Sequence, residues 1–293
     1  MKTLTRPALR YMGGKWRLAP WIIHHFPPHR VYLEPFGGAA SVLLQKQRSY
    51  AEIYNDLDGS IVNVFRVLQN AVHGAELVRR LEVTPFARAE FELSYELSTD
   101  PIENARRTIV RSFMGHGATA IALRRKTGFR ADSNRSGSTP AHDWARLPPA
   151  LALITERFGG VAIENRPAMS LIDRFDSADT LHYLDPPYMH HSRSRKRVKG
   201  ELEHAYAHEM SDGEHEEMLA RIVGLEGMVV LSGYRSDLYD RKLSGWYRVE
   251  KAALADGARR RVEVLWLNDA AASRMTAPLF PDSSIYEVSQ IQN

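Results

Sequence analysis

Short apolar runs alternate with helical stretches near both ends of this chain of 293 residues. The runs at 31–33, 52–54, 161–163, 180–184, 228–231 and 262–267 predict strands, and helices are expected from about Ala40, from about Ser60 and over 212–223. Repeated strand and helix units favour a mainly parallel sheet with helices on both faces. In such folds, ligands bind at the carboxyl ends of the strands. We therefore predict an α/β fold whose site lies at that edge of the sheet.

The middle of the chain has a different character. From Gly74 to about Phe158, helical stretches rich in Arg and Glu lead through a Gly-His-Gly sequence into a polar stretch at 132–138. We interpret residues 71–158 as an inserted, mostly helical domain, and residues 1–70 and 159–293 as one core domain. The 44% of hydrophobic and 25% of charged residues suit a soluble globular protein.

Several classes of protein are disfavoured by what the sequence lacks. The chain has no cysteine, which rules out disulfides, thiolate nucleophiles and cysteine-bound zinc. No apolar run approaches the roughly 20 residues that cross a bilayer, and no apolar stretch precedes Pro7, so neither a membrane span nor a signal peptide is expected. His190 and His191 have no acidic or histidine partner at helical spacing, so we expect no metal. These absences favour a cytoplasmic protein.

The first predicted strand runs into a glycine pair. Gly37 and Gly38 follow it directly, and such a turn lets a nucleoside ligand lie close to the backbone. Asp56 ends the next strand, 18 residues after Gly38, where a carboxylate can accept hydrogen bonds from both ribose hydroxyls. Two alternatives stay open: the glycine pair as a plain strand-to-helix turn, and Asp56 as a helix cap, a role that Asp58 and Ser60 also suit.

A more specific pattern, Asp185-Pro186-Pro187-Tyr188, follows the strand at 180–184. Prolines cannot donate to a strand ladder, so they end the strand and hold their carbonyls in fixed directions. The Asp185 carboxylate and the Pro186 carbonyl could accept both hydrogens of an amine, which turns the nitrogen lone pair toward a sulfonium methyl group. Tyr188 could stack on a base swung out of a duplex. The alternative is a strand followed by an ordinary Pro-Pro turn.

Positive charge is concentrated in the middle of the chain. Residues 106–135 hold eight basic side chains against Asp132, a net +7, so a total of +4 leaves −3 for the rest. Such a stretch suits phosphates, and its arginines could read guanine edges. A second basic loop, 193–199, could clamp DNA next to Tyr188. A solvated charged face and a flexible polar loop, respectively, are the alternatives.

Together these motifs resemble the Dam-type DNA adenine methyltransferase family, particularly members carried by phages. The family's aromatic-x-Gly-Gly-Lys motif is matched at 11–15, its cofactor motif at 34–41, its ribose acid at 55–56 and its catalytic motif at 185–188. Later segments at 212–219, 231–234 and 263–268 match in order. Two positions depart from the pattern: Ala40 stands where the family often has glycine, and Tyr11 where some members have tryptophan.

The resemblance implies a Rossmann-like S-adenosylmethionine-dependent methyltransferase fold, with residues 71–158 as its target-recognition insertion. It implies methyl transfer to the 6-amino group of adenine in double-stranded DNA, leaving S-adenosylhomocysteine. The implied cofactor residues are Tyr11, Gly13, Lys15, Glu34, Phe36, Gly38, Asp56 and Asp185, and the catalytic ones are Asp185, Pro186, Pro187 and Tyr188. The expected DNA contacts are Arg124, Arg125, Lys126, Arg130, Asn134 and Arg135. We expect a monomer or weak dimer without a metal, in the cytoplasm of a bacterial or phage-infected cell.

Two other functions compete with this interpretation. One is an RNA or protein methyltransferase that acts on an amine or amide, but methylation of protein glutamine usually has asparagine in place of Asp185. The other is a DNA-binding relative without catalytic activity. The presence of Lys15, Asp56 and Asp185 argues against it, and a titration with the cofactor would separate the two.

Overall fold

The computed structural model describes residues 4–96, 98–117, 121, 126–131, 138–189, 197–198, 201–202, 208–255 and 259–275. Within these residues, one sheet has seven strands in the order β3-β2-β1-β4-β7-β9-β8. Its strands are β1 (Val31–Glu34), β2 (Ala51–Asn55), β3 (Val161–Glu164), β4 (Thr180–Leu184), β7 (Met228–Gly233), β8 (Tyr247–Ala255) and β9 (Arg259–Leu267). A separate pair joins β5 (Arg197–Val198) to β6 (Glu201–Leu202).

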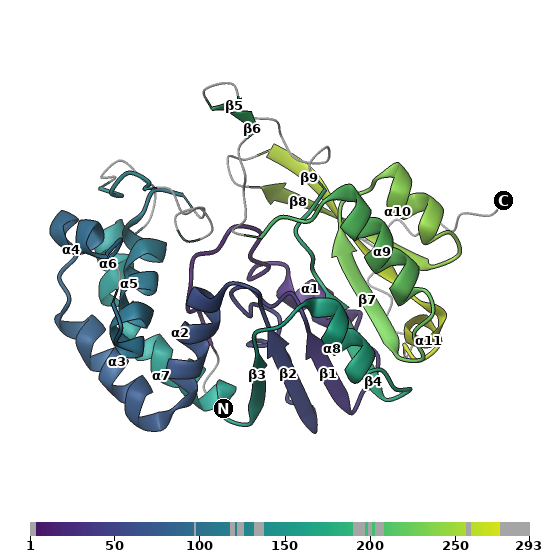
Figure 1. The fold of residues 1–293 in the computed structure, drawn as a ribbon, viewed down its shortest axis with the longest axis horizontal. Coiled ribbons are helices and arrows are strands. Elements are labelled where there is room, and N and C mark those ends of the chain that lie inside the picture. The colour runs from purple at the N-terminus through teal and green to yellow at the C-terminus, as the bar shows by residue number, and fades with distance from the viewer. Residues whose placement is uncertain are drawn as a thin grey trace.

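The helices fall into two groups in Figure 1. Those that accompany the sheet are α1 (Ala19–His24), α2 (Gly59–Gln69), α8 (Ala168–Arg174), α9 (Asp212–Ile222), α10 (Asp237–Lys242) and α11 (Asp269–Ala272). Those that gather beyond the β3 edge are α3 (Ala71–Val83), α4 (Arg88–Leu93), α5 (Pro101–Met114), α6 (Pro140–Ala145) and α7 (Leu147–Phe158). No helix in the described part of the chain is long and apolar enough to span a membrane.

The sheet is mainly parallel, as predicted. Strands β3, β2, β1, β4 and β7 pair in parallel, whereas β9 runs antiparallel to both β7 and β8. The chain moves from β1 outward to β2 and β3, and then returns to place β4 on the other side of β1. The order therefore reverses between β1 and β4, and the crevice outside their carboxyl ends is where this class of fold binds ligands.

Residues that alternate along the strands bury both faces of the sheet. Tyr32, Tyr183 and Val230 belong to a core that also includes buried residues of α1, α2 and the helices beyond β3. Their neighbours Leu184 and Leu231 belong to a second core with α8, α9 and α10. Apolar residues at successive positions are thus explained by helices on both sides of the strands.

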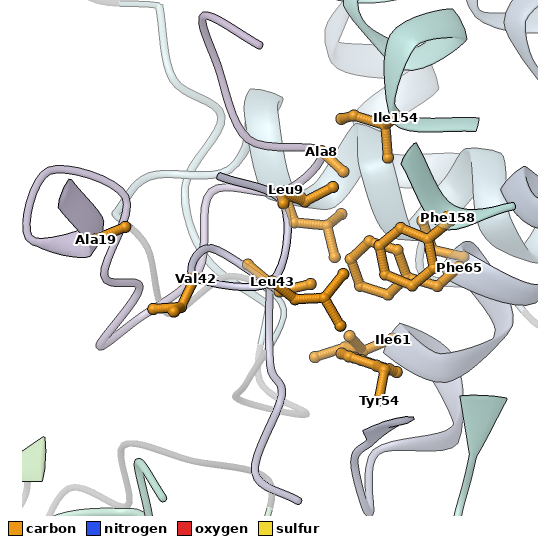
Figure 2. Close-up of a cluster of buried hydrophobic side chains, with 14 of the residues drawn as sticks. Ala8, Leu9, Ala19, Val42, Leu43, Tyr54, Ile61, Phe65, Ile154 and Phe158 are labelled. Carbon is orange, nitrogen blue, oxygen red and sulfur yellow. The ribbon is translucent and has the colours of Figure 1, made fainter. Parts of the chain in front are cut away.

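The helices at 71–158 share the first of these cores. Helix α2 contacts α3, α5 and α7, and Phe65 of α2 stacks on Phe158 of α7 with ring centroids 4.5 Å apart. Figure 2 shows Tyr54 of the sheet, Phe65 and Phe158 in one cluster with Leu9 and Leu43. The buried surface is therefore continuous from the sheet to these helices, and the division into domains at 70 and 159 stays a prediction.

The helix expected from about Ala40 is wrong, because residues 41–46 form turns. Ala40 has φ 53°, in the left-handed region, so Ala40 itself is not part of a right-handed helix. This conformation costs an alanine about 1–2 kcal/mol, which gives a physical reason why glycine suits the position. The strand predicted at 262–267 is also longer than expected, since β9 begins at Arg259.

Candidate active site

A cavity lies at the carboxyl ends of β1, β2 and β4, where the strand order reverses. It encloses about 930 Å³ of empty space, part of it open to solvent. Its walls come from 11–15, 34–42, 56–58, 185–187 and the segment before α9, and every residue expected to bind the cofactor is among them. Tyr188 is not part of this lining but lies beside it, with its ring centroid 4.7 Å from the Lys15 ammonium.

The turn after β1 has room for Gly37 and Gly38 but not for residues with a side chain. A Cβ on Gly37 would lie 2.2 Å from the ring of Tyr54 and 2.9 Å from the carbonyl oxygen of Asn55. Gly38 has φ 47°, and its carbonyl accepts a 2.7 Å hydrogen bond from the Tyr54 hydroxyl. The turn after β1 is therefore pressed against the end of β2, and its backbone forms one wall of the cavity.

Asp56 faces this turn from the end of β2. Its Oδ2 accepts a hydrogen bond from the Gly38 amide and its Oδ1 from the Asp58 amide, both at 2.8 Å. Burial raises the pKa of Asp56 and the two amides oppose that rise. The cap of α2 is Asp58, whose side chain accepts from the Ser60 amide at 2.9 Å. Asp56 is thus not the helix cap, and each of its oxygens keeps a lone pair for a further donor.

Lys15 and Asp185 form an ion pair inside the site. The Lys15 ammonium lies 2.9 Å from Asp185 Oδ2 and donates to the Gly13 carbonyl, also at 2.9 Å. Burial lowers the pKa of Lys15, but Asp185 and Glu263 together raise it above its ordinary value. Burial raises the pKa of Asp185, and Lys15, together with a hydrogen bond from the Tyr188 side chain, counters that rise. Asp185 Oδ1 is buried, and no described residue donates a hydrogen bond to it. One oxygen is thus held by Lys15 while the other is an unfilled acceptor.

Glu34 is a third acid in the cavity wall, and its carboxyl group holds its proton to a higher pH than an exposed glutamate. It is buried, and its Oε2 accepts hydrogen bonds from the Tyr32 hydroxyl at 2.7 Å and the Leu43 amide at 3.1 Å. Burial raises the pKa of Glu34 to about 8, with a further rise from the negative charge of Asp185. At neutral pH Glu34 is therefore mainly a neutral acid.

Replacing Glu34 by glutamine is expected to remove a pH dependence of stability. Between the unfolded pKa near 4.5 and the folded value near 8, the folded protein holds a proton that the unfolded chain has lost, so stability falls as pH rises. The slope is about 1.4 kcal/mol per pH unit. Glutamine has no such proton, so its stability advantage should grow from pH 5 to pH 8 in urea unfolding. Parallel stability curves for the two proteins would contradict this assignment.

Glu263 and Tyr234 belong to the site although the motifs did not assign them a role. Glu263 of β9 is 7% exposed, and its Oε2 accepts a 3.1 Å hydrogen bond from the Tyr188 hydroxyl. Tyr234 follows β7, with its ring centroid 4.4 Å from that of Tyr188. The available signal was the matching segments at 231–234 and 263–268, which an antiparallel last strand brings to the same edge of the sheet.

The segment before α9 supplies the remaining wall. His208, Glu209, Met210 and Glu214 line the cavity. The segment is fixed by a capping box, in which the Ser211 hydroxyl accepts from the Glu214 amide and the Glu214 carboxylate accepts from the Ser211 amide. A serine followed three residues later by glutamate was a visible signal for the helix start, but not for a binding role.

The expected DNA contacts are only partly described. Arg124, Arg125, Asn134 and Arg135 lie outside the described residues, as does most of the loop 193–199. Lys126 is exposed, with its ammonium 5.5 Å from the Tyr95 ring centroid. Arg130 is 5% exposed, so its guanidinium would have to move to reach a duplex.

Part of the positive charge at 106–135 is neutralised within the helices. Arg106 pairs with Glu90 at 2.7 Å and with Glu103 at 2.8 Å, and Arg107 pairs with Glu103 at 2.7 Å. Arg111 donates to the Ser94 carbonyl. These three arginines hold α5 against α4 and its surroundings, so they account for little of the charge available to a partner.

Comparison with known proteins supports one family. The family model described as "D12 class N6 adenine-specific DNA methyltransferase" matches residues 11–220. A comparison with curated proteins gives no match. The matched range contains the glycine turn, Asp56, the whole helical segment and the Asp-Pro-Pro-Tyr motif, and it covers well over half of the chain. The chain therefore belongs to the D12 class of N6 adenine-specific DNA methyltransferases.

Proposed function

We propose that Asp185 and the Pro186 carbonyl receive the amine of the target adenine, and that Asp56 holds the ribose of S-adenosylmethionine in the same cavity. The observation that carries this proposal is the placement of Asp185. It lies in one cavity with Asp56, with Oδ2 held by Lys15 and Oδ1 unfilled. A carboxylate oxygen without a donor suits an incoming N–H group.

The residues present fit the cofactor that the family implies. Asp56 has acceptor capacity for the ribose hydroxyls, the Gly37–Gly38 turn allows close approach of backbone, and Tyr11 and Phe36 offer aromatic surface at the wall. When bound, S-adenosylmethionine supplies an electrophilic methyl group on a sulfonium cation. The Asp185 carboxylate, ionised beside Lys15, adds a negative charge that favours this cation. Described residues include no cluster of acids and histidines able to hold a metal.

The chemistry of the chain's own residues follows from this placement. Asp185 Oδ1 and the Pro186 carbonyl accept the two amine hydrogens, which directs the nitrogen lone pair away from the base plane. Lys15 keeps Asp185 ionised and oriented. Asp185 then accepts the proton that the nitrogen loses as it gains the methyl group, a role that its raised pKa suits. Tyr188 contacts the extruded base.

The variant Asp56→Ala tests the placement of the cofactor. It removes two charged acceptors, so we expect the dissociation constant for S-adenosylmethionine to rise by about 10- to 100-fold with little change in DNA affinity. Calorimetric titration of both ligands gives the measurement. The control is Asn70→Ala, which removes the cap of α3 outside the cavity wall and lowers stability by about 1 kcal/mol, with a far smaller effect on the cofactor. If Asp56→Ala weakened both ligands equally, a folding defect would explain the loss.

We further propose that the protein acts on double-stranded DNA in the cytoplasm, as a monomer or weak dimer, with contacts from Arg124, Arg125, Lys126, Arg130, Asn134 and Arg135. Among the described side chains, Lys126 and Arg88 support this proposal. Both are exposed, and Arg88 lies over the Phe129 ring with its guanidinium carbon 5.1 Å from the centroid. An aromatic ring attracts the cation over it, and exposed lysine and arginine side chains are the groups that neutralise phosphates.

Neutralising Lys126 tests this surface. A phosphate contact releases a counterion, so Lys126→Ala should reduce the slope of log affinity against log salt by about 1, equally on cognate and scrambled duplexes. A loss of roughly 1–3 kcal/mol on the cognate duplex alone would instead indicate base reading. The control is Arg79→Ala, an exposed arginine of α3 that pairs with Glu76 at 2.7 Å. An unchanged affinity and slope for Lys126→Ala would mean that the residue only faces solvent.

A further inference from the structure

We propose that Glu263 is a positioning residue that fixes Tyr188 and Tyr234 as a rigid aromatic wall beside the target amine. This inference rests on the proposed placement of the amine at Asp185. It assigns a function to a buried acid that the Asp-Pro-Pro-Tyr motif does not contain.

The fold brings Glu263 to the site from the far end of the chain. Strand β9 is antiparallel to β7, with Gly233, the last residue of β7, opposite Val264. Glu263 therefore lies just beyond the carboxyl end of β7, at the edge of the sheet that carries the site. Glu263 is 7% exposed there, and its Oε2 accepts the Tyr188 hydroxyl at 3.1 Å. Burying a carboxylate there costs free energy unless polar groups form hydrogen bonds with it.

Glu263 also reaches the second tyrosine. The Tyr234 hydroxyl makes hydrogen bonds with Glu263 and Arg261, and burial raises the pKa of Tyr234 to about 12. The rings of Tyr188 and Tyr234 meet edge to face at 4.4 Å and 61°, and the Arg261 guanidinium carbon lies 5.0 Å from the Tyr234 centroid. One carboxylate therefore ties two neighbouring rings together through their hydroxyls.

Tyr188 is held at more than one point. Lys15 lies 4.7 Å from its ring centroid, Tyr234 packs against its ring, and Glu263 accepts from its hydroxyl. Lys15 is also the partner of Asp185, so the orientation of Tyr188 is coupled to that of the catalytic carboxylate. A ring fixed before the base arrives loses less conformational entropy when it binds. Glu263 thus acts on the reaction through Tyr188 and makes no contact of its own with the amine.

A double-mutant cycle tests this inference. Tyr188→Phe keeps the ring and removes the hydroxyl, and Glu263→Ala removes the acceptor. We expect each to lower kcat by about 10-fold or more. The loss in the double variant should be clearly smaller than the product of the two single losses, because both substitutions remove the hydrogen bond between Tyr188 and Glu263. Tyr188→Phe also removes a hydrogen bond to Asp185, and Glu263→Ala one to Tyr234. Glu263→Gln should keep most of the turnover, since its amide oxygen still accepts the hydroxyl. The dissociation constant for S-adenosylmethionine, measured by calorimetry, should change less than threefold in all of them.

Several outcomes would overturn the inference. Multiplicative losses in the double variant would mean that the two residues act independently, and a Glu263→Gln variant as slow as Glu263→Ala would mean that the charge matters and not the hydrogen bond. If Glu263→Ala did not fold, Tyr188→Phe and Glu263→Gln would still test the inference, which predicts a slow Tyr188→Phe and a nearly normal Glu263→Gln. Glu250→Ala, which removes an acid of β8 that pairs with Arg248 at 3.2 Å, is the matched control.

The same experiment separates this inference from the proposed function. If Tyr188→Ala kept normal turnover on an adenine-containing duplex, the proposed site of the target base would be wrong. If Tyr188→Ala were inactive and Glu263→Ala were normal, only the positioning by Glu263 would be wrong.

Discussion

Asp185→Ala is expected to abolish methyl transfer, with a fall in kcat of at least about 1,000-fold. In the proposed mechanism, the substitution removes both the acceptor for the amine hydrogen and the group that takes the proton. It also removes the partner that lies 2.9 Å from the buried Lys15 ammonium, so some loss of stability accompanies it. Glu263, which also raises the pKa of Lys15, remains to offset that charge.

The measurement is transfer of a labelled methyl group from S-adenosylmethionine to a duplex that contains adenine. Asp185→Asn is the matched variant, since it keeps the shape of the side chain but offers one oxygen where two are needed. We expect it to fold normally and to lose at least about 100-fold in kcat. Near-normal turnover in either folded variant would refute the assignment of Asp185.

Lys15→Met is expected to have the second largest effect. Methionine fills a similar volume, but the substitution leaves Asp185 buried without its counter-charge, which destabilises a protein by about 3–5 kcal/mol. Because Lys15 lowers the pKa of Asp185, its loss lets burial raise that pKa further. The reaction needs the ionised carboxylate, so activity at neutral pH should fall steeply.

The pH profile distinguishes this explanation from simple unfolding. The acid limb of kcat should move to higher pH in Lys15→Met, so that the loss relative to the parent protein is largest below neutral pH and partly recovered at pH 9. Circular dichroism at each pH verifies the fold. A loss of the same size at every pH would mean that Lys15 does not act through the ionisation of Asp185.

Much of the fold and of the site could be predicted from local sequence. Strands β1, β2, β4 and β7 are short runs with turn residues after them, and their mostly apolar residues belong to the cores on both faces of the sheet. Strand β3, at the edge, is only partly buried. Much of the cavity wall follows the ends of β1, β2 and β4, so the positions of these residues in the sequence indicated where they lie in the fold. Asp56 and Asp185 could be placed at the same edge of the sheet without knowledge of any contact.

The remaining features depend on contacts between distant segments. Strand β8 lies at the edge of the sheet with β9 as its neighbour, and its sequence mixes charged residues such as Arg248 and Glu250 with apolar ones. Alanine itself does not favour the left-handed conformation of Ala40, and the available sign was that the family often has glycine at this position. Charge counted over 106–135 omitted Glu90 and Glu103, which neutralise Arg106 and Arg107 from outside that window.

Helix α2 connects the cavity to the helices beyond β3. Its first turn follows directly on Asp56 and Asp58 in the cavity wall, and its flank packs against α3, α5 and α7, with Phe65 stacked on Phe158. Closely packed helices move together, so a shift of α3–α7 on a duplex would carry the loop that holds Asp56 and Asp58 with it. Cofactor and DNA would then bind cooperatively: each would change the affinity for the other by the same factor, because such linkage is reciprocal.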